Sequence, residues 1–279
     1  MHYIHAIDSI KLASTKNIIK IEMTKNAMAN WRARSVASGI HFFISVSIAG
    51  LAGMLVFVLW YPYPYSEISG GRQLFTLVVA VDVVLGPLMT LIIFNRAKPR
   101  RELLSDLTVV AMLQLAALGY GLWTVFVSRP VHLVFEYSRM TVVHAIDTTP
   151  DLLAKAPPGL QRLPLRGPTV VALRPFESPA EEFDATMAAL NGAPLAARSD
   201  LWQPYVTATP RILKEAKPAS DLHGHFPGQA DLINQAIAAT GRSVAGLRYL
   251  PLLDRHVAWT VLLDAVTAEP LGFVPLDSF

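Results

Sequence analysis

One carboxylate inside a long apolar stretch has the clearest capacity for chemistry in this chain. Asp82 lies within LFTLVVAVDVVLGPLMTLIIF, a run long enough to cross a bilayer as a helix. A carboxylate at that depth is costly and usually faces a polar partner or a water-filled cavity. Counted at about 1.5 Å per residue, Tyr120 on the next apolar run falls at a similar depth, and Gln114 is a poorer match. We therefore predict an Asp82–Tyr120 hydrogen bond.

Two interpretations of Asp82 remain open. It either engages a polar or charged group on a membrane partner, or it is an internally hydrogen-bonded residue of the helix bundle. Gly86 and Pro87 follow one turn later, and Pro87 removes a backbone hydrogen bond, so we expect a kink there. Such a kink is common in structural helices and is also compatible with a role in partner binding.

A second candidate interaction surface is a stripe of small residues on the first apolar run. Ser45, Ala49 and Gly53 recur every four residues, a spacing that allows two helices to approach closely. We expect the stripe to pack against the chain's own second or third helix, and the alternative is a helix of another protein.

Little in the chain indicates catalysis or a cofactor. There is no cysteine, and no G-x-S-x-G, H-E-x-x-H, Walker or G-x-G-x-x-G motif occurs. His223 and His225 flank a glycine, but two histidines without a third ligand of clear spacing are weak grounds for a metal site. We expect no catalytic residues, no cofactor and no metal, and hence no enzyme.

The elements that position these residues follow from hydropathy. The chain of 279 residues is 52% hydrophobic and 16% charged, with a mean hydropathy of +0.39. Three apolar runs, at 39–60, 74–94 and 107–128, are each long enough to span a bilayer. We therefore expect a membrane protein with three transmembrane α-helices in residues 39–128, followed by an extracytoplasmic α+β domain at 129–279. Residues 1–38 form a cytoplasmic N-terminal segment, in which Met23 and Met28 are alternative starts.

Basic residues set the expected orientation. They cluster before the first run and between the second and third, which places both flanks in the cytoplasm and residues 129–279 in the periplasm. The residues concerned are Lys11, Lys16, Lys20, Lys25, Arg32, Arg34, Arg96, Lys98, Arg100 and Arg101. The aromatic side chains after the first run are expected as anchors at the membrane interface, namely Trp60, Tyr61, Tyr63 and Tyr65.

Charge distribution argues against nucleic-acid binding. Residues 1–128 carry 11 Lys/Arg against 6 Asp/Glu, whereas residues 129–279 carry 13 against 15. The positive excess that gives a net charge of +3 therefore belongs to the membrane flanks, and the domain available to a partner is slightly acidic.

Alternation and turn residues outline the outer domain. VHLVFEY and MTVVHAI predict a hairpin, Thr169–Leu173 a strand, and a short helix is expected near Asp151–Lys155. Ser178 and Glu181 form a capping-box pattern that begins a helix ending at Gly192, and a further helix is expected over Gln229–Thr240. GLRYLPLL, HVAWTVLLDAV and PLGFVPL predict a three-stranded meander.

Residues 36–146 resemble the TfpX/TfpZ family of type IV pilin accessory proteins. The resemblance rests on the WYP exit at Trp60, the Gly70-Gly71 pair, the helix with Asp82 and Gly86-Pro87, and the Arg129-Pro130-Val131 entry into the outer domain. One departure is Tyr137-Ser138-Arg139-Met140 in place of an acidic-basic-aromatic hairpin turn. The N-terminal extension lies outside the resemblance.

The resemblance implies an accessory role in type IV pilus (fimbrial) biogenesis and twitching motility at the bacterial inner membrane. It implies the major pilin as partner, with the pilus assembly machinery as a further candidate, and no catalytic residues. The helices are expected to bind the pilin's helix and the outer domain its globular head. The alternatives are an extracytoplasmic sensor or signalling module, a cell-envelope enzyme, and, least favoured, a transporter.

Overall fold

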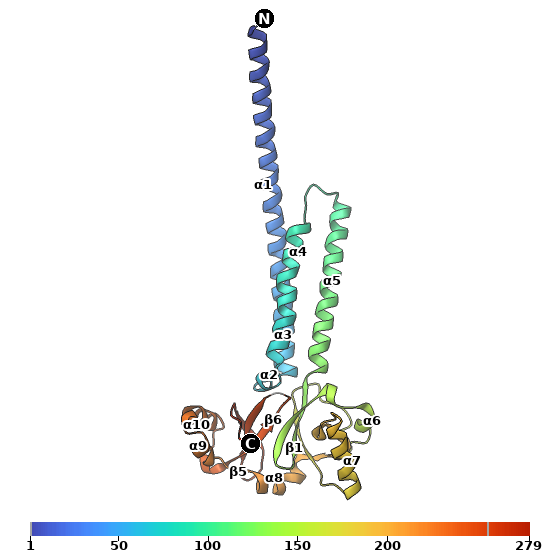
Figure 1. Cartoon of the computed structure of the whole chain (residues 1–279), viewed down its shortest axis with the longest axis vertical. Helices are drawn as coiled ribbons and strands as arrows, with labels where there is room; N and C mark the ends of the chain where they lie inside the picture. The colour runs from blue at the N-terminus through green and yellow to red at the C-terminus, as the bar shows by residue number, and fades with distance from the viewer. Residues whose placement is uncertain (1, 256) are drawn as a thin grey trace. The chain divides into compact units, whose positions relative to one another are not determined.

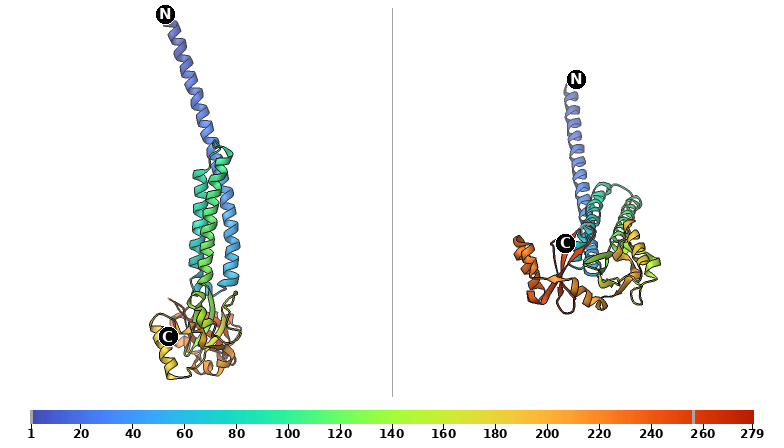
Figure 2. Two further views of the ribbon diagram at one scale, coloured as in Figure 1. Left: turned by 90° about the vertical axis from the view of Figure 1, so that its right-hand side faces the viewer. Right: turned by 60° about the horizontal axis from the view of Figure 1, so that its bottom comes forward.

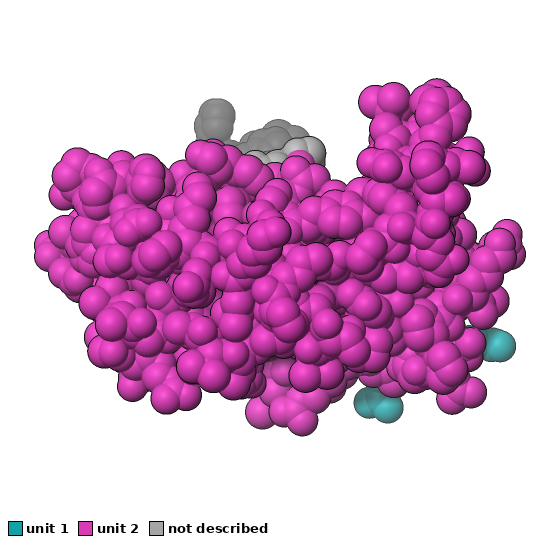
Figure 3. Space-filling view, turned by 90° about the horizontal axis from the view of Figure 1, so that it is seen from below, with its two compact units in different colours: residues 1–52, 76–121 teal, residues 53–75, 122–279 magenta. Residues whose placement is uncertain are grey.

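The computed structural model describes residues 2–255 and 257–279, and of residues 2–19, 21 and 26 it describes the backbone alone. The chain forms two compact units. One comprises residues 1–52 and 76–121, and the other comprises residues 53–75 and 122–279. Figure 3 shows the surface of the second unit. The alternative starts Met23 and Met28 lie in helix, whereas Met1 lies outside the described residues.

Three helices of the described chain are long and apolar enough to cross a membrane, which confirms the three predicted apolar helices. They cover Glu22–Trp60, Gly71–Ile93 and Arg100–Val127. The first is α1 (His2–Leu55) with a π-helical turn at Val56–Trp60. The second is α3 (Gly71–Ala80), a π-helical turn at Val81–Leu85 and α4 (Gly86–Ile93). The third is α5 (Arg100–Val127).

Within the first unit these helices run side by side (Figures 1 and 2). Most of their large apolar side chains face outward, among them Phe43, Leu51 and Met112. A water-soluble bundle would bury this surface. Apolar residues on the outside are what a helix needs where lipid surrounds it.

The second unit is built on a mixed sheet of eight strands in the order β4-β3-β1-β2-β6-β7-β8, with β5 paired to β6. The predicted hairpin, the predicted strand and the predicted meander are all confirmed. Two parallel pairs, β1 with β3 and β2 with β6, join these pieces into one sheet. The strands are β1 Pro130–Glu136, β2 Arg139–His144, β3 Thr169–Leu173, β4 Trp202–Pro204, β5 Lys217–Pro218, β6 Leu247–Leu253, β7 Ala258–Asp264 and β8 Pro270–Val274.

α7 packs in the cluster around Trp202 and α9 and α10 pack at the β6–β8 part of the sheet, whereas α2 and α8 contribute to the central cluster. Ser178 Oγ accepts from Glu181 N at 3.2 Å and begins α7 as predicted, but the Glu181 carboxylate binds Arg174 and Glu177 N, so only half of the capping box forms. The helices are α2 Tyr65–Ile68, α6 Pro150–Leu153, α7 Pro179–Leu190, α8 Thr209–Glu215, α9 Asp221–His225 and α10 Ala230–Ala239. The 3₁₀ turns are Ala145–Asp147, Leu195–Ala197, Ser199–Leu201, Tyr205–Ala208, Pro227–Gln229 and Val244–Gly246.

Both faces of the central strands are covered. In β1, Leu133 and Phe135 join one buried cluster, whereas Val131 and Val134 join another around Trp202. A third cluster packs α9 and α10 against β6, β7 and β8. Every residue of β1 is buried, including the polar His132 and Glu136, so both faces of this strand are covered.

Most of the aromatic side chains that follow the first helix are buried or half-buried in the second unit. Tyr61 is fully buried, and its hydroxyl donates to Val125 O at 3.1 Å. Tyr65 is also buried and packs edge-on against Phe273. Only Tyr63 of the three tyrosines is exposed, at 78%, and Trp60 is half-buried against Phe126. The prediction of interfacial anchors is therefore wrong for Tyr61 and Tyr65, because the domain's own fold covers them.

The Gly70-Gly71 pair has a steric explanation. Gly70 takes a φ of +67°, a backbone conformation that is unfavourable for residues with a Cβ atom. A Cβ at Gly71 would lie 2.4 Å from Cδ1 of Tyr61, so the bare glycine is what allows the buried ring to lie against this turn.

Candidate functional site

Asp82 is buried in the helical unit and bonded to the third helix. It is 8% exposed, and Gln114 Nε2 donates to both its Oδ1 and its backbone oxygen, each at 3.2 Å. The sequence favours Tyr120 over Gln114 as the partner of Asp82. In the structure Gln114 is the bonded side chain and Tyr120 is 75% exposed, which corrects that order. The second helix begins at Gly71 instead of Leu74, so Asp82 lies farther along it than the sequence count assumed, at a level nearer Gln114.

The π-helical turn and Gly86 make this pairing possible. Asp82 lies within the turn Val81–Leu85, and Pro87 follows at the start of α4. Because Pro87 lacks an N–H and its ring crowds the preceding turn, the regular helix cannot continue through this point. A Cβ on Gly86 would lie only 1.8 Å from Gln114 Nε2. Any larger residue at position 86 must therefore displace the amide that satisfies Asp82.

Two further polar contacts join α1 to α4 around Pro87. His41 Nδ1 lies 2.5 Å from Thr90 Oγ1, and Ser38 Oγ donates to Pro87 O at 2.8 Å. The Ser38 contact satisfies a carbonyl beside the helix irregularity. Sequence reasoning missed both contacts, although a histidine within a membrane-length apolar run was a signal of the same kind as Asp82.

Part of the predicted small-residue face is covered by the chain itself. Ser45 and Ala49 are buried in the helical unit. Gly53 falls in the other unit, where a Cβ would come within 3.1 Å of the Phe75 ring. The small side chains thus allow close packing inside this chain, and the prediction of an external helix partner on the same face remains a prediction.

These polar groups surround a small cavity of about 230 Å³. Its lining is His41, Ile44, Ser45, Ile48, Asp82, Ala111, Gln114, Leu115 and Leu118. A carboxylate, an amide, an imidazole and a hydroxyl therefore converge on one space within apolar helices. Such a space can accept a hydrogen-bond donor or a water molecule.

A polar cluster that the sequence did not reveal lies in the sheet unit. His144 and Asp254 are buried, with 3.5 Å between His144 Nε2 and Asp254 Oδ1. His144 Nδ1 lies 3.4 Å from Asp147, and Arg255 pairs with Asp147 at 2.7 Å. Burial opposes ionisation of Asp147, but its contacts with His144 and Arg255 outweigh this and lower its pKa. The cluster fastens the end of β2 to the β6–β7 turn.

Three further histidines of the described sheet unit have structural partners. His132 is buried, with Nδ1 2.8 Å from Thr169 Oγ1 and its ring edge-on to Trp202. His223 Nε2 lies 2.9 Å from Asn234 Oδ1, and His225 Nδ1 lies 2.9 Å from Asp221 O. Among the described residues, no three His, Cys, Asp or Glu side chains are grouped for a metal ion.

One helix of the sheet unit presents an apolar stripe to the outside. On α7, Phe183 is 64% exposed, and Met187 and Leu190 are also exposed. Spacing of four and three residues puts the three side chains on one face. Glu182 and Asp184 are exposed beside them, so the stripe has an acidic margin. An exposed run of this kind is typical of a protein-binding surface.

The chain combines three apolar helices of membrane-spanning length with a mixed-sheet domain. Asp82 and Gln114 form a buried pair within the helices. Residues 29–70 match the family described as "Fimbrial assembly protein FimB". The fimbrial assembly protein of serogroup I from Dichelobacter nodosus is 34% identical over 230 residues, covering 81% of this chain and 89% of that protein. The serogroup E1 protein is 32% identical over 229 residues, with the same shares. The chain therefore belongs to the FimB family of fimbrial assembly proteins.

A third relative, for serogroups C1 and C2 of the same organism, is 39% identical over 119 residues, covering 43% of this chain and 91% of that protein. No solved structure matches the chain.

Proposed function

We propose that this chain is a non-catalytic accessory protein of type IV pilus biogenesis, of the TfpX/TfpZ type, that binds the major pilin in the bacterial inner membrane. Membership of the fimbrial assembly family supports the process. The outward-facing apolar residues of three long helices support membrane insertion. Basic residues before the first span and between the second and third support a cytoplasmic N-terminus and a periplasmic sheet domain.

The observation that carries the binding role is the cavity at Asp82. A buried carboxylate among apolar helices can accept a donor from a neighbouring helix, and Gln114 keeps it hydrogen-bonded in the absence of a partner. In this proposal, a pilin waiting in the bilayer places a polar group of its helix at this cavity. The contact holds the pilin until it enters the assembling fibre.

The periplasmic half of the proposal uses the stripe on α7. Phe183, Met187 and Leu190 would contact an apolar patch on the pilin head. The acidic margin at Glu182 and Asp184 favours a patch bordered by Lys or Arg. Two contacts on one partner would raise the apparent affinity beyond that of either contact alone.

In-membrane crosslinking tests this proposal. A photo-reactive residue replaces Phe43 on the exposed face of α1, and in a second variant Phe183 on α7, followed by mass spectrometry of the crosslinked products. Capture of the major pilin at both positions is expected. A matched control places the same residue at Val266, which is exposed in the sheet unit away from α7, and should capture much less pilin.

Asp82→Ala separates the two halves of the proposal. If Asp82 receives the pilin helix, this variant should lose the crosslink from position 43. Unchanged capture would identify Asp82 as internal structure. Absence of pilin at both positions, with other envelope components captured instead, would overturn the pilin-binding role and favour a sensor.

A further inference from the structure

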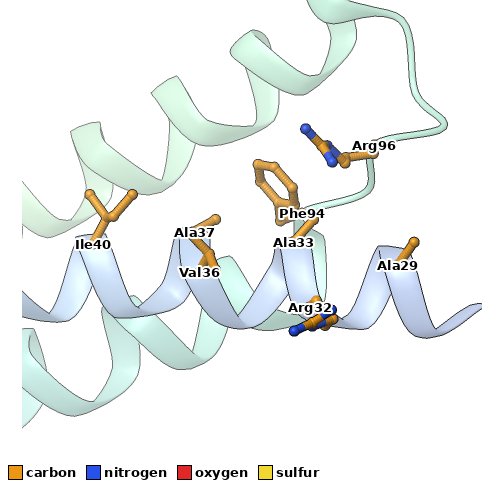
Figure 4. Close-up of a pocket in the computed structure, with 8 residues that line it drawn as sticks. All are labelled: Ala29, Arg32, Ala33, Val36, Ala37, Ile40, Phe94 and Arg96. Atoms are coloured by element: carbon orange, nitrogen blue, oxygen red, sulfur yellow. The ribbon is translucent and has the colours of Figure 1, made fainter.

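A second groove lies on the helical unit where the loop between α4 and α5 begins, and it is separate from the Asp82 cavity. Its volume is about 560 Å³. One wall is a face of α1 and the other is the end of the second helix. The lining is Ala29, Arg32, Ala33, Val36, Ala37, Ile40, Phe94 and Arg96. Figure 4 shows Ile40 at one end of the groove and Ala29 at the other, with Arg32 and Arg96 near the level of Ala33 on different sides of the α1 ribbon.

The two halves of the groove differ in chemistry. From Ala33 to Ile40 the residues of α1 that line the groove are apolar, whereas Arg32 and Arg96 bring two guanidinium groups to the part near Ala33. Neither Arg32 nor Arg96 forms an ion pair with a described residue, and both are exposed. Their neighbour Lys98 pairs with both Glu102 and Asp106, so the nearby carboxylates already have a partner.

The Asn30 side chain holds the loop that carries Arg96. Asn30 Nδ2 donates to Asn95 Oδ1 at 3.1 Å, and Arg96 N donates to Asn30 Oδ1 at 3.3 Å. These bonds fix the start of the loop after α4 against α1. As a result Arg96 lines the same groove as Arg32, although the two residues are far apart in the sequence.

We propose that this groove binds an anionic phospholipid, with its phosphate at Arg32 and Arg96, its glycerol along Ala33 and Ala37, and an acyl chain that passes Ile40 into the first span. Arginine pairs well with phosphate oxygens, and basic pockets between helices on the cytoplasmic side bind acidic head groups. The apolar end extends towards the middle of the first span, as an acyl chain requires. The inference rests on the membrane insertion and orientation of the proposed function, and does not depend on pilin binding.

Native mass spectrometry of the full chain, released from bilayers of equal phosphatidylglycerol and phosphatidylcholine, tests the proposal. We expect phosphatidylglycerol to be retained preferentially. An arginine that contacts the phosphate of an anionic lipid favours that lipid by roughly fivefold. Arg32→Gln with Arg96→Gln should therefore reduce the preference by roughly 30-fold. Arg100→Gln with Arg101→Gln removes the same charge from the same flank outside the groove and should leave most of the preference intact.

A steric variant checks that the groove itself is responsible. Ala37→Trp fills the apolar half without changing charge and should release the bound lipid, whereas Ala117→Trp on the exposed face of α5 should not. Equal loss in the two double-arginine variants, or retention in Ala37→Trp, would overturn the site. A chain that stays out of the membrane fraction would instead overturn the proposed function, so the two failures are distinguishable.

Discussion

In the helical unit Phe43, Leu51 and Met112 face outward while Asp82 and Ser45 are buried, whereas in the sheet unit Phe135 and Trp202 are buried. Apolar side chains are expected where water is absent. For the sheet unit that place is its core, and under the membrane insertion proposed above it is the outer surface of the helices. In the core of the sheet unit, a buried polar residue is ordinary structure when it is hydrogen-bonded. Among the apolar helices, under the proposed function, a buried polar residue is a feature that a partner can recognise.

The largest expected effect tests the contrast between buried and exposed phenylalanine within the sheet unit. Phe135→Ala removes a fully buried ring and should lower the free energy of unfolding by about 3–5 kcal/mol. Phe183→Ala on the α7 stripe should change it by less than about 0.5 kcal/mol. Denaturant unfolding of the detergent-solubilised chain, followed by near-ultraviolet circular dichroism, measures both. A large loss in Phe183→Ala would mean that the stripe is part of the core.

The next prediction concerns the stability of the sheet unit in acid. Burial lowers the pKa of His132 to about 4, partly offset by its contact with Thr169. Because the folded pKa lies below the ordinary value of 6.5, the stabilisation is complete above pH 6.5 and is lost as the pH falls towards 4. The loss should reach about 3 kcal/mol for the sheet unit.

Replacing His132 by Gln removes the titration and should flatten this dependence. The melting temperature measured from pH 7 to pH 4 for the two proteins tests it. An identical acid dependence in His132→Gln would assign the effect to groups other than His132.

The smallest effect concerns two glycines of the helical unit. Gly86→Ala places a methyl group where Gln114 lies and should cost about 1–3 kcal/mol by displacing that amide from Asp82. Gly119→Ala meets no atom within 4 Å and should be neutral or stabilising by up to about 1 kcal/mol. Thermal unfolding in detergent compares the two variants. Equal stability would mean that Gln114 can move without cost and that the Asp82 pairing is loose.

The sequence by itself determined what depends on local pattern. Run length gave the three apolar helices, alternation gave the β1–β2 hairpin and the β6–β8 meander, and Ser178 gave the start of α7. Each of these depends on residues close together in the chain, where period and capping are physical constraints.

Only the tertiary structure decided which distant residues meet. The parallel pairs β1–β3 and β2–β6 and the short strands β4 and β5 have no local signal, because a partner strand supplies their hydrogen bonds. Tyr61 and Tyr65 have the composition of an interface belt and are buried by the sheet domain. Gln114 displaced Tyr120 as the partner of Asp82 because the start of a helix and the steric freedom at Gly86, not residue type, set which side chains come within hydrogen-bond distance.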